Sequence, residues 1–358
     1  MNRLLESAWI RLLAVAAAAA GVVALLWWRG PAWGAVADAF TFVRWELVVA
    51  AIGLNLVSVL VRAIAWKTVI DQAMPQPRPR FLGVFSAFGV GLFANAVLPG
   101  RVGELARVAV LTRKLPQRGA AWPTLLGTVF AHRVFDLVAS MLLVVYVLIT
   151  ARIPDWATTS LSLVAAVGGA LLVLAVVLAR RHHRSVLDEL GPVRKVVEMG
   201  RHGLGVMHAP LPALVAICFQ CLGWLCQLFA VYVAMRAFNI HAPLPAAGLV
   251  LVLMNVAILF PLWPGNVGLV QAAIALPLVG YGVAKAKGIA YGFGLQAIEA
   301  SVGVGVGLLF LAREGLTFAM LRVMPDAAQA EVPERARAAE PEGEAEPERP
   351  RARVAGKP

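Results

Sequence analysis

The sequence predicts an all-α protein that crosses a membrane several times and contains two inverted repeats. Of its 358 residues, 60% are hydrophobic and 15% are charged, whereas a soluble domain has about 25% charged residues. Several apolar stretches reach the roughly 20 residues with which a helix crosses about 30 Å of hydrocarbon. Apolar residues run continuously rather than alternating, which disfavours a membrane β-barrel. A motif rich in proline and glycine occurs twice, which indicates the repeat.

Eight apolar spans follow one another along the chain. They lie at 12–28, 46–70, 81–98, 121–149, 159–179, 211–236, 246–263 and 288–312. The first span ends in Trp27 and Trp28, which favours a retained helix with interfacial aromatic residues over a cleaved signal peptide. Beyond Pro325, charged residues and prolines replace large apolar side chains. This tail cannot bury a core and is expected to be disordered.

The internal repeat is the most informative feature of the sequence. Pro99-Gly100-Arg101-Val102-Gly103 recurs as Pro264-Gly265-Asn266-Val267-Gly268. We call the separation of these two motifs the repeat offset. When the repeat offset is added to the spans 46–70, 81–98 and 121–149, they align with three later apolar segments without a gap. This agreement favours duplication over chance. We therefore expect an N-terminal transmembrane helix and loop, a first membrane repeat, a linking helix with a basic cytoplasmic loop, a second membrane repeat and a disordered cytoplasmic tail, at residues 1–45, 46–150, 151–210, 211–315 and 316–358.

Basic residues flank the third span, 81–98, on both sides. Arg78 and Arg80 precede it, and Arg113 and Lys114 follow it. If the span crossed the membrane completely, one cluster would lie outside, against the tendency of basic residues to stay in the cytoplasm. A re-entrant hairpin removes the conflict, because two half-helices then enter from the cytoplasm, turn in the bilayer and return.

The same geometry in 246–280 gives about six full transmembrane helices and two re-entrant hairpins that enter from opposite faces. Proline and glycine suit the turns, and the predicted hinge residues are Pro99, Gly100, Gly103, Pro264, Gly265 and Gly268. The net charge of +12 is then carried mostly by short cytoplasmic loops. We expect a multi-pass protein of a bacterial inner membrane, with both termini in the cytoplasm and no nucleic-acid partner.

Polar and charged residues inside these apolar segments are the candidate functional residues, because a charge in hydrocarbon costs several kcal/mol unless it is paired or hydrated. Glu104 and Arg107 are spaced i,i+3, as are Arg133 and Asp136, so each pair is equally a structural clamp or part of a ligand site. Glu299 has no basic neighbour at helical spacing, and it is free to bind a cationic group, exchange a proton or pair with an arginine of the first repeat. The predicted head-group-binding residues are Asn95, Arg101, Glu104, Arg107, Arg133, Asp136, Asn266, Gln271, Gln296 and Glu299.

Other notable residues have structural interpretations. Arg62, Trp66 and Lys67, near the end of the second span, are interpreted as interfacial anchors. Three cysteines in the sixth span have no histidine or carboxylate nearby and are interpreted as packing residues, with no disulfide assigned. No motif of soluble catalysis or nucleotide binding occurs, so no catalytic residue, metal or cofactor is expected.

Four segments carry a resemblance to a known family. They are 91–107 (GLFANAVLPGRVGELAR), 132–136 (HRVFD), 264–268 (PGNVG) and 296–299 (QAIE). With these segments the chain resembles the integral-membrane, flippase-like region of the lysylphosphatidylglycerol synthase family. The resemblance implies a domain that moves or handles lipid between leaflets, whereas aminoacylation in the full synthases belongs to a separate cytoplasmic domain. Because 316–358 is too short for that domain, we do not carry over an aminoacyl-lipid substrate.

We therefore expect a non-enzymatic lipid translocase whose partners are membrane lipids, either anionic or polyprenyl-linked. In this hypothesis Arg101, Arg107 and Arg133 hold a phosphate, and Asn95, Gln296 and Glu299 shape the rest of the path. One alternative is a membrane-embedded transferase on a lipid substrate, with Glu104, Asp136 or Glu299 as its acid–base group. The other is a non-catalytic partner of an envelope glycosyltransferase, bound through the loop at 180–209 or the tail.

Overall fold

The computed structural model describes residues 32–74, 76, 78–98, 102–115, 118–180, 210–259 and 266–315. Within these ranges all regular structure is helical: α2 (Trp33–Thr41), α3 (Trp45–Ala73), α4 (Phe81–Val97), α5 (Gly103–Thr112), α6 (Arg118–Thr150), α7 (Asp155–Arg180), α9 (Pro210–Ala237), α10 (Leu244–Leu259), α11 (Leu269–Val279) and α12 (Lys285–Arg313). The predicted all-α fold is confirmed. The span at 12–28, the loop at 181–209 and the tail from 316 lie outside the described residues, so the count of eight spans stays a prediction.

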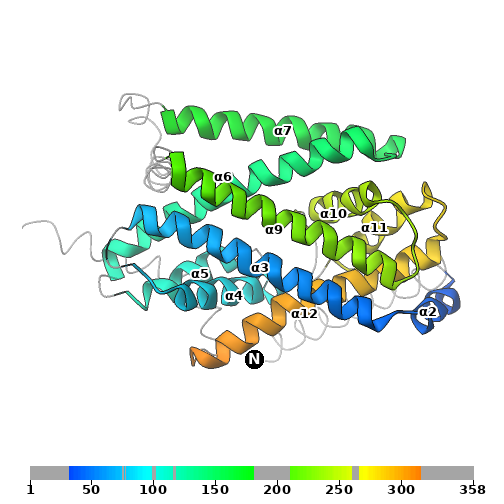
Figure 1. Cartoon of the computed structure of the whole chain (residues 1–358), viewed down its shortest axis with the longest axis horizontal. Helices are drawn as coiled ribbons and strands as arrows, with labels where there is room; N and C mark the ends of the chain where they lie inside the picture. The colour runs from blue at the N-terminus through cyan, green and yellow to red at the C-terminus, as the bar shows by residue number, and fades with distance from the viewer. Residues whose placement is uncertain are drawn as a thin grey trace, which may run out of the picture.

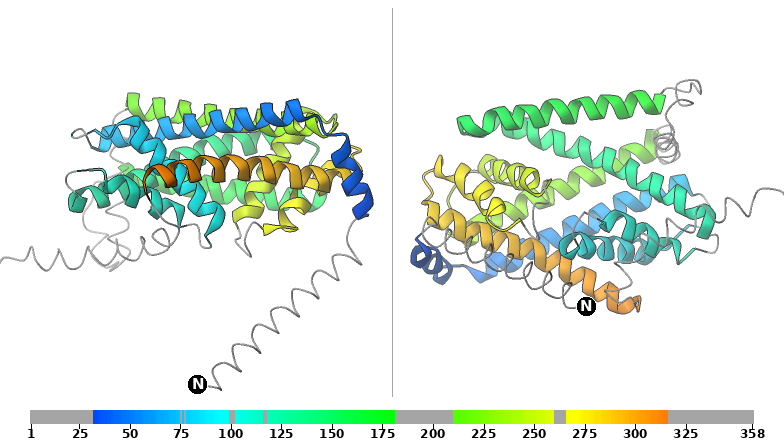
Figure 2. Two further views of the ribbon diagram at one scale, coloured as in Figure 1. Left: turned by 90° about the horizontal axis from the view of Figure 1, so that it is seen from below. Right: turned by 180° about the vertical axis from the view of Figure 1, so that it is seen from behind.

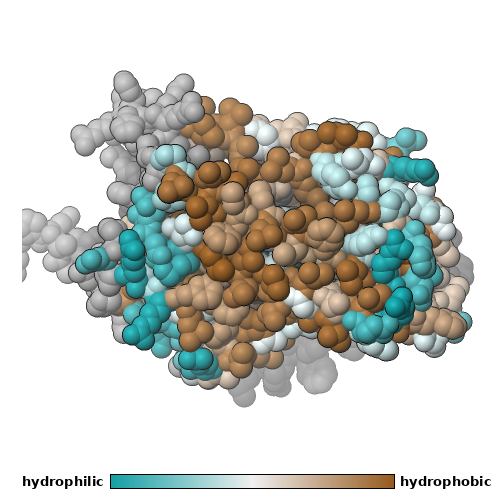
Figure 3. Space-filling model, viewed as in Figure 1, coloured by the Kyte–Doolittle hydropathy of each residue, from teal (hydrophilic) through white to brown (hydrophobic). Residues whose placement is uncertain are grey.

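Five helices are long and apolar enough to cross a membrane, namely α3, α6, α7, α9 and α12. They run from one end of the molecule to the other (Figure 1), and α7 lies at the edge of the bundle beside α6. Figure 3 shows a broad hydrophobic band between two hydrophilic ends. This surface suits a bundle whose middle contacts hydrocarbon and whose ends contact water, so the chain is a multi-pass membrane protein.

Four shorter helices form two hairpins, α4–α5 and α10–α11. Of these, α4, α10 and α11 are apolar. A helix of 17 residues such as α4 is about 25 Å long, less than the roughly 30 Å of hydrocarbon. A Cβ atom on Gly83, near the start of α4, would lie 3.6 Å from Cδ of Lys114, just after α5. The flanking residues Arg80 and Arg113 therefore lie at the same end of the bundle, which we call the basic end.

The two hairpins lie toward opposite ends of the bundle, and both Figure 1 and the view from behind in Figure 2 show this separation. This arrangement agrees with the predicted re-entrant pair. Of the predicted hinge residues, Gly103 and Gly268 are at the starts of the returning helices. Pro99, Gly100, Pro264 and Gly265 lie outside the described residues.

The helix bounds follow the repeat offset. With that offset α3, α4, α5 and α6 fall on α9, α10, α11 and α12, with differences of only a few residues at each end. Helices α3 and α9 pack against each other and run in opposite directions (Figure 1). At their contact, Ser58 Oγ–H donates a 2.7 Å hydrogen bond to the carbonyl of Gly223, its equivalent in the second repeat. The two repeats therefore run in opposite directions through the bundle and meet at this contact.

One helix was not predicted. Residues 33–41 form α2 within the region expected to be a loop. Phe40 packs edge-on against Phe238, with ring centres 5.5 Å apart, and Asn239 Nδ2–H donates to the carbonyl of Phe42 at 2.8 Å. Helix α2 is therefore held by contacts with residues just after α9 and by packing against α12, which local sequence patterns do not encode.

Candidate functional site

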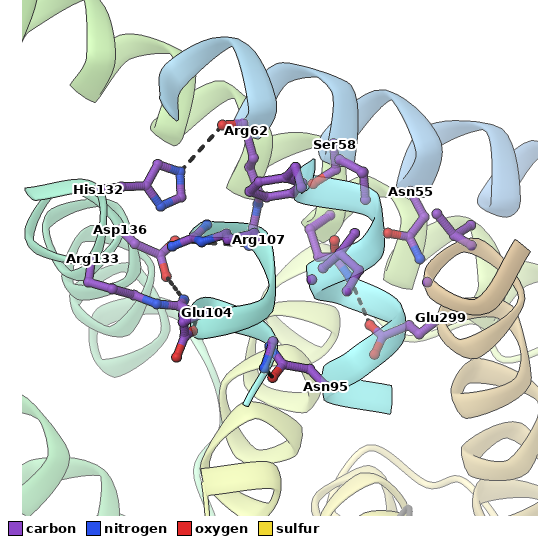
Figure 4. Close-up of a pocket in the computed structure, with 18 residues that line it drawn as sticks. Asn55, Ser58, Arg62, Asn95, Glu104, Arg107, His132, Arg133, Asp136 and Glu299 are labelled. Carbon is purple, nitrogen blue, oxygen red and sulfur yellow. Dashed lines mark hydrogen bonds and ion pairs between the residues drawn. The ribbon is translucent and has the colours of Figure 1, made fainter. Parts of the chain in front are cut away.

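A cavity of about 210 Å³ lies beside the first hairpin, enclosed by α3, α4, α5, α6, α9 and α12 (Figure 4). Its polar lining consists of Asn55, Ser58, Arg62, Asn95, Glu104, Arg107, His132, Arg133, Asp136, Gln227 and Glu299. Six of the ten predicted site residues are among them. Polar groups from both repeats thus meet in one cavity within the apolar bundle.

Two glycines let the helices of the first hairpin approach closely. A Cβ atom on Gly103 would lie 2.0 Å from the carbonyl oxygen of Gly91, so no larger residue fits there. The backbone N–H of Gly103 donates to Asn95 Oδ1 at 2.8 Å. This contact joins the start of α5 to the end of α4, and it places Glu104 and Arg107 on the cavity wall.

The charged residues of α5 and α6 form a network rather than the predicted local pairs. Glu104 does not pair with Arg107, as its i,i+3 spacing suggested, but with Arg133 of α6. Arg133 also pairs with Asp136, with Nη1 3.3 Å from Oδ2, so this second i,i+3 pair is formed. The side chain of Arg133 is 49% exposed, so these pairs lie at the open side of the cavity.

Asp136 is the centre of this network. Its Oδ1 accepts hydrogen bonds from Gln220 and from Trp224 Nε1–H, the latter at 2.8 Å. Arg62 Nη1 lies 3.9 Å from the same oxygen. One carboxylate thus connects helices α3, α6 and α9, which satisfies the requirement that a buried charge be paired and hydrogen-bonded.

The interpretation of Arg62 and Trp66 as interfacial anchors was wrong. Arg62 points into the cavity, and its guanidinium lies 4.7 Å from the ring centre of Trp224. Trp66 is fully buried, and its Nε1–H donates to Thr128 Oγ1 at 3.1 Å. Lys67 pairs with Asp71 one turn further along α3. The spacing of Asn55, Ser58 and Arg62, three and then four residues apart, was the available signal for a polar helix face.

Arg107 has a different environment from the other arginines. It is only 4% exposed, and its guanidinium lies over aromatic rings, 4.7 Å from the ring centre of Trp66 and 5.6 Å from that of Phe88. Among the described residues it forms no ion pair, and its Nε and Nη2 groups have no hydrogen-bond partner. Aromatic faces stabilise a cation, but they leave its N–H donors available to a ligand.

Glu299 lies on the other side of the cavity, on α12 (Figure 4). Its Oε1 accepts a 2.7 Å hydrogen bond from Gln227 Nε2–H. Within the described chain it makes no ion pair, so the suggested pairing with Arg107 or Arg133 is absent from this structure. Asn55, which is 5% exposed, also lines this part of the cavity.

The other predicted residues lie elsewhere. Asn266, Gln271 and Gln296 are at the second hairpin, where Asn266 Nδ2–H donates to the carbonyl of Ala257 at 3.1 Å and Gln271 Nε2–H donates to Gln296 Oε1 at 2.6 Å. These amides hold helices together and do not line the cavity. Arg101 lies outside the described residues. His132, noted in the sequence but not predicted as a site residue, lines the cavity, with Nε2 3.3 Å from the carbonyl oxygen of Arg62.

Comparisons with known proteins identify the family. No curated protein and no solved structure matches the chain. The family model of the lysylphosphatidylglycerol synthase transmembrane region matches residues 11–307, which include both hairpins and every residue that lines the cavity. The chain therefore belongs to the lysylphosphatidylglycerol synthase transmembrane-region family.

Proposed function

We propose that this protein carries a phospholipid or lipid-linked head group between the leaflets of a bacterial inner membrane, with the head group in the cavity and the acyl chains in the bilayer. The observation that carries the proposal is Arg107, a buried cation without a carboxylate partner among the described residues. Such a charge is costly in a membrane protein unless a ligand neutralises it. A phosphate ester is a suitable ligand, because its oxygens accept charge-assisted hydrogen bonds from a guanidinium.

The proposed orientation has the basic end in the cytoplasm. Arg78, Arg80, Arg113 and Arg313 are at this end, and basic residues are enriched in cytoplasmic loops. The first hairpin then enters from the cytoplasm and the second from the outside. Inverted repeats of this kind support transport, because the two halves can exchange which side of a central site is open.

Transport is favoured over catalysis by the state of two carboxylates. Glu104 pairs with Arg133, and Asp136 pairs with both Arg133 and Arg62. Pairing with arginine favours the charged form of a carboxylate over the protonated form that a general acid needs. Two of the three candidate acid–base groups therefore form ion pairs within the protein. For this reason we propose a transporter rather than an enzyme.

The test uses the purified full-length chain in liposomes that contain phospholipids with a fluorophore on the acyl chain. Dithionite in the outside solution quenches only outer-leaflet probes, so translocation appears as an increase in the quenched fraction. Arg107→Gln should slow translocation about tenfold or more, because a hydrogen bond to a charged group contributes about 1.5–3 kcal/mol. Arg152→Gln is the matched control, since Arg152 is exposed at the opposite end. Absence of translocation for every phospholipid class would contradict the proposal.

A further inference from the structure

A second cavity, of about 380 Å³, lies at the basic end of the bundle, outside the site described above. Its walls come from the start of α4, the end of α5 and the end of α12, with the residues beside them. The end of α12 lies beside the first hairpin (Figure 1), where Phe310 packs edge-on against Phe85 with ring centres 5.3 Å apart. A smaller cavity of about 170 Å³ shares Lys114 and Glu314 with the second one. The two cavities therefore form one hollowed surface where the two repeats meet.

Arginine side chains dominate this surface. Lys114 pairs with Glu314, which also accepts a hydrogen bond from Ser86 Oγ–H, so the charges of that lysine and that glutamate cancel. Four further basic residues line the two cavities, are exposed and form no ion pair with any described residue: Arg78, Arg80, Arg113 and Arg313. We call this arginine-lined region the basic surface. Because like charges repel one another, an anion bound among them is stabilised.

The same chain contains a block of acidic residues after α12. Residues 340–348, which we call the acidic block, read EPEGEAEPE and contain no basic residue. The carboxylates occupy every second position: Glu340, Glu342, Glu344, Glu346 and Glu348. Pro341 and Pro347 disfavour a helix in this block, and alternate side chains of an extended chain point to the same side. An extended acidic block would therefore present all its carboxylates to one surface.

The acidic block is within reach of the basic surface. Gly315 follows Glu314, which lines that surface, so the tail begins at the basic end and on the same side of the bilayer. The chain from Gly315 to Glu340 spans up to about 80 Å when extended. Helix α12, with 29 residues, is about 44 Å long, so distance does not prevent contact. The covalent connection also gives the block a higher effective concentration than a separate peptide would have.

From this complementarity we propose that the acidic block binds the basic surface of its own chain, with its glutamates paired to the four arginines. An exposed ion pair contributes little by itself, so binding depends on several pairs formed together and on the covalent connection. The bound block covers the contact between α4 and α12. It competes there with other anions, including the anionic lipids of the adjoining leaflet.

Carbodiimide cross-linking of the full-length protein in a neutral detergent tests this contact, because the reagent joins a carboxylate to an amine without a spacer. Arg80→Lys keeps the charge and supplies the amine. Its cross-link to the acidic block, identified by mass spectrometry of the digested protein, should be about tenfold more abundant than that of Arg152→Lys. Arg152 is the matched control, since it is exposed at the opposite end. Raising the ionic strength from about 0.01 M to about 1 M shortens the Debye length from about 30 Å to about 3 Å and should abolish the cross-link.

Chemical labelling of arginines with phenylglyoxal separates the acidic block from the rest of the tail. Replacing its five glutamates by glutamine should increase the labelling of the four arginines of the basic surface severalfold. Arg107, which is only 4% exposed, should stay unlabelled, and this shows that the variant is folded. The control variant replaces three other acidic residues of the tail by their amides and should leave the labelling unchanged: Asp326, Glu331 and Glu334.

Four results would overturn the proposal. The first is the absence of a cross-link from Arg80→Lys to the acidic block, or an equal yield from Arg152→Lys. The second is an equal increase of labelling in the control variant. In a mixture of isotope-labelled and unlabelled protein, cross-links mainly between different chains would assign the basic surface to a second copy. Loss of the cross-link in liposomes when phosphatidylglycerol replaces phosphatidylcholine would assign it to the membrane. None of these measurements depends on lipid translocation, so this proposal and the proposed function are tested separately.

Discussion

The two hairpins have the same backbone plan and different chemistry. In each, the returning helix begins with a glycine whose backbone N–H is bound by a side-chain amide: Gly103 N–H donates to Asn95 Oδ1 at 2.8 Å, and Gly268 N–H donates to Gln271 Oε1 at 2.6 Å. The two glycines are equivalent under the repeat offset, but one amide precedes its glycine and the other follows it. In both repeats a side-chain amide oxygen therefore accepts a hydrogen bond from this backbone N–H, but a residue at a different position supplies it.

The environments of the hairpins differ more strongly. The first hairpin faces the charged cavity, whereas the second contacts α12 through the uncharged amides of Gln271 and Gln296. Its packing against α12 is close, because a Cβ atom on Gly292 would lie 3.2 Å from Cα of Gln271. The residues equivalent to Arg107 and Asp136 are Ala272 and Ser301. After duplication, one half can thus supply most of the charged groups of the cavity, whereas the other supplies Glu299 and an uncharged hairpin. Substitutions at equivalent positions test this difference.

The largest effect is expected for Asp136→Asn. It removes the carboxylate that joins α3, α6 and α9 and leaves Arg62 without its partner, so the free energy of unfolding should fall by about 4 kcal/mol. Thermal or denaturant-induced unfolding in detergent measures the change. The equivalent substitution in the second repeat, Ser301→Ala, removes only a hydroxyl bonded within α12 and should cost less than about 1 kcal/mol. Similar losses for the two variants would contradict the proposed asymmetry.

A smaller and more informative difference is expected between the two glycines. Gly103→Ala places a methyl group against the backbone of α4 and should destabilise the protein by about 3 kcal/mol. Gly268 has φ +96° and no atom within 4 Å of the added Cβ, so Gly268→Ala should cost about 1–2 kcal/mol through backbone strain alone. Unfolding in detergent distinguishes the two. If Gly268→Ala is the more harmful, close helix packing is not what requires Gly103.

The smallest effect concerns the contacts at the ends of the two hairpins that lie away from their turns. Glu314 follows α12 and accepts hydrogen bonds from Lys114 and from Ser86 Oγ–H, the latter at 2.5 Å, whereas Tyr281 Oη, after α11, accepts the uncharged backbone N–H of Arg152 at 2.7 Å. Burial alone raises the pKa of Glu314, but the hydrogen bonds from Lys114 and Ser86 outweigh it and lower that pKa below its ordinary value.

A lowered carboxylate pKa stabilises the fold above the unfolded value, about 4.3, and this contribution is lost as pH falls through the folded pKa. Glu314→Gln should therefore be less stable than the unsubstituted protein at pH 7, by about 0.5 kcal/mol. The difference should shrink as the pH falls below about 4 and vanish below the folded pKa. The measurement is the difference in unfolding temperature between the two proteins across this pH range, and a constant difference would exclude the ion pair as its cause.

The sequence predicted much of the fold because the relevant signals are local. The length of an apolar stretch decides whether a helix can cross the bilayer, and the Pro-Gly motifs with their repeat offset located both hairpins. Six of the ten predicted site residues line the cavity, since a charge within an apolar span is itself a sign of function. Arg62 and Trp66 were misinterpreted because a position near the end of a helix was taken to mean the membrane interface.

The sequence by itself determined which segments are helices, that the chain contains two related halves and that certain charges lie within apolar segments. Only the tertiary structure decided which charges meet. Helical periodicity fixes the direction of a side chain relative to its own helix, but the packing of α3 against α9 and of α5 against α6 sets its partners. For this reason Glu104 pairs with Arg133 rather than Arg107, and Arg107 is left with two aromatic rings and no carboxylate among the described residues.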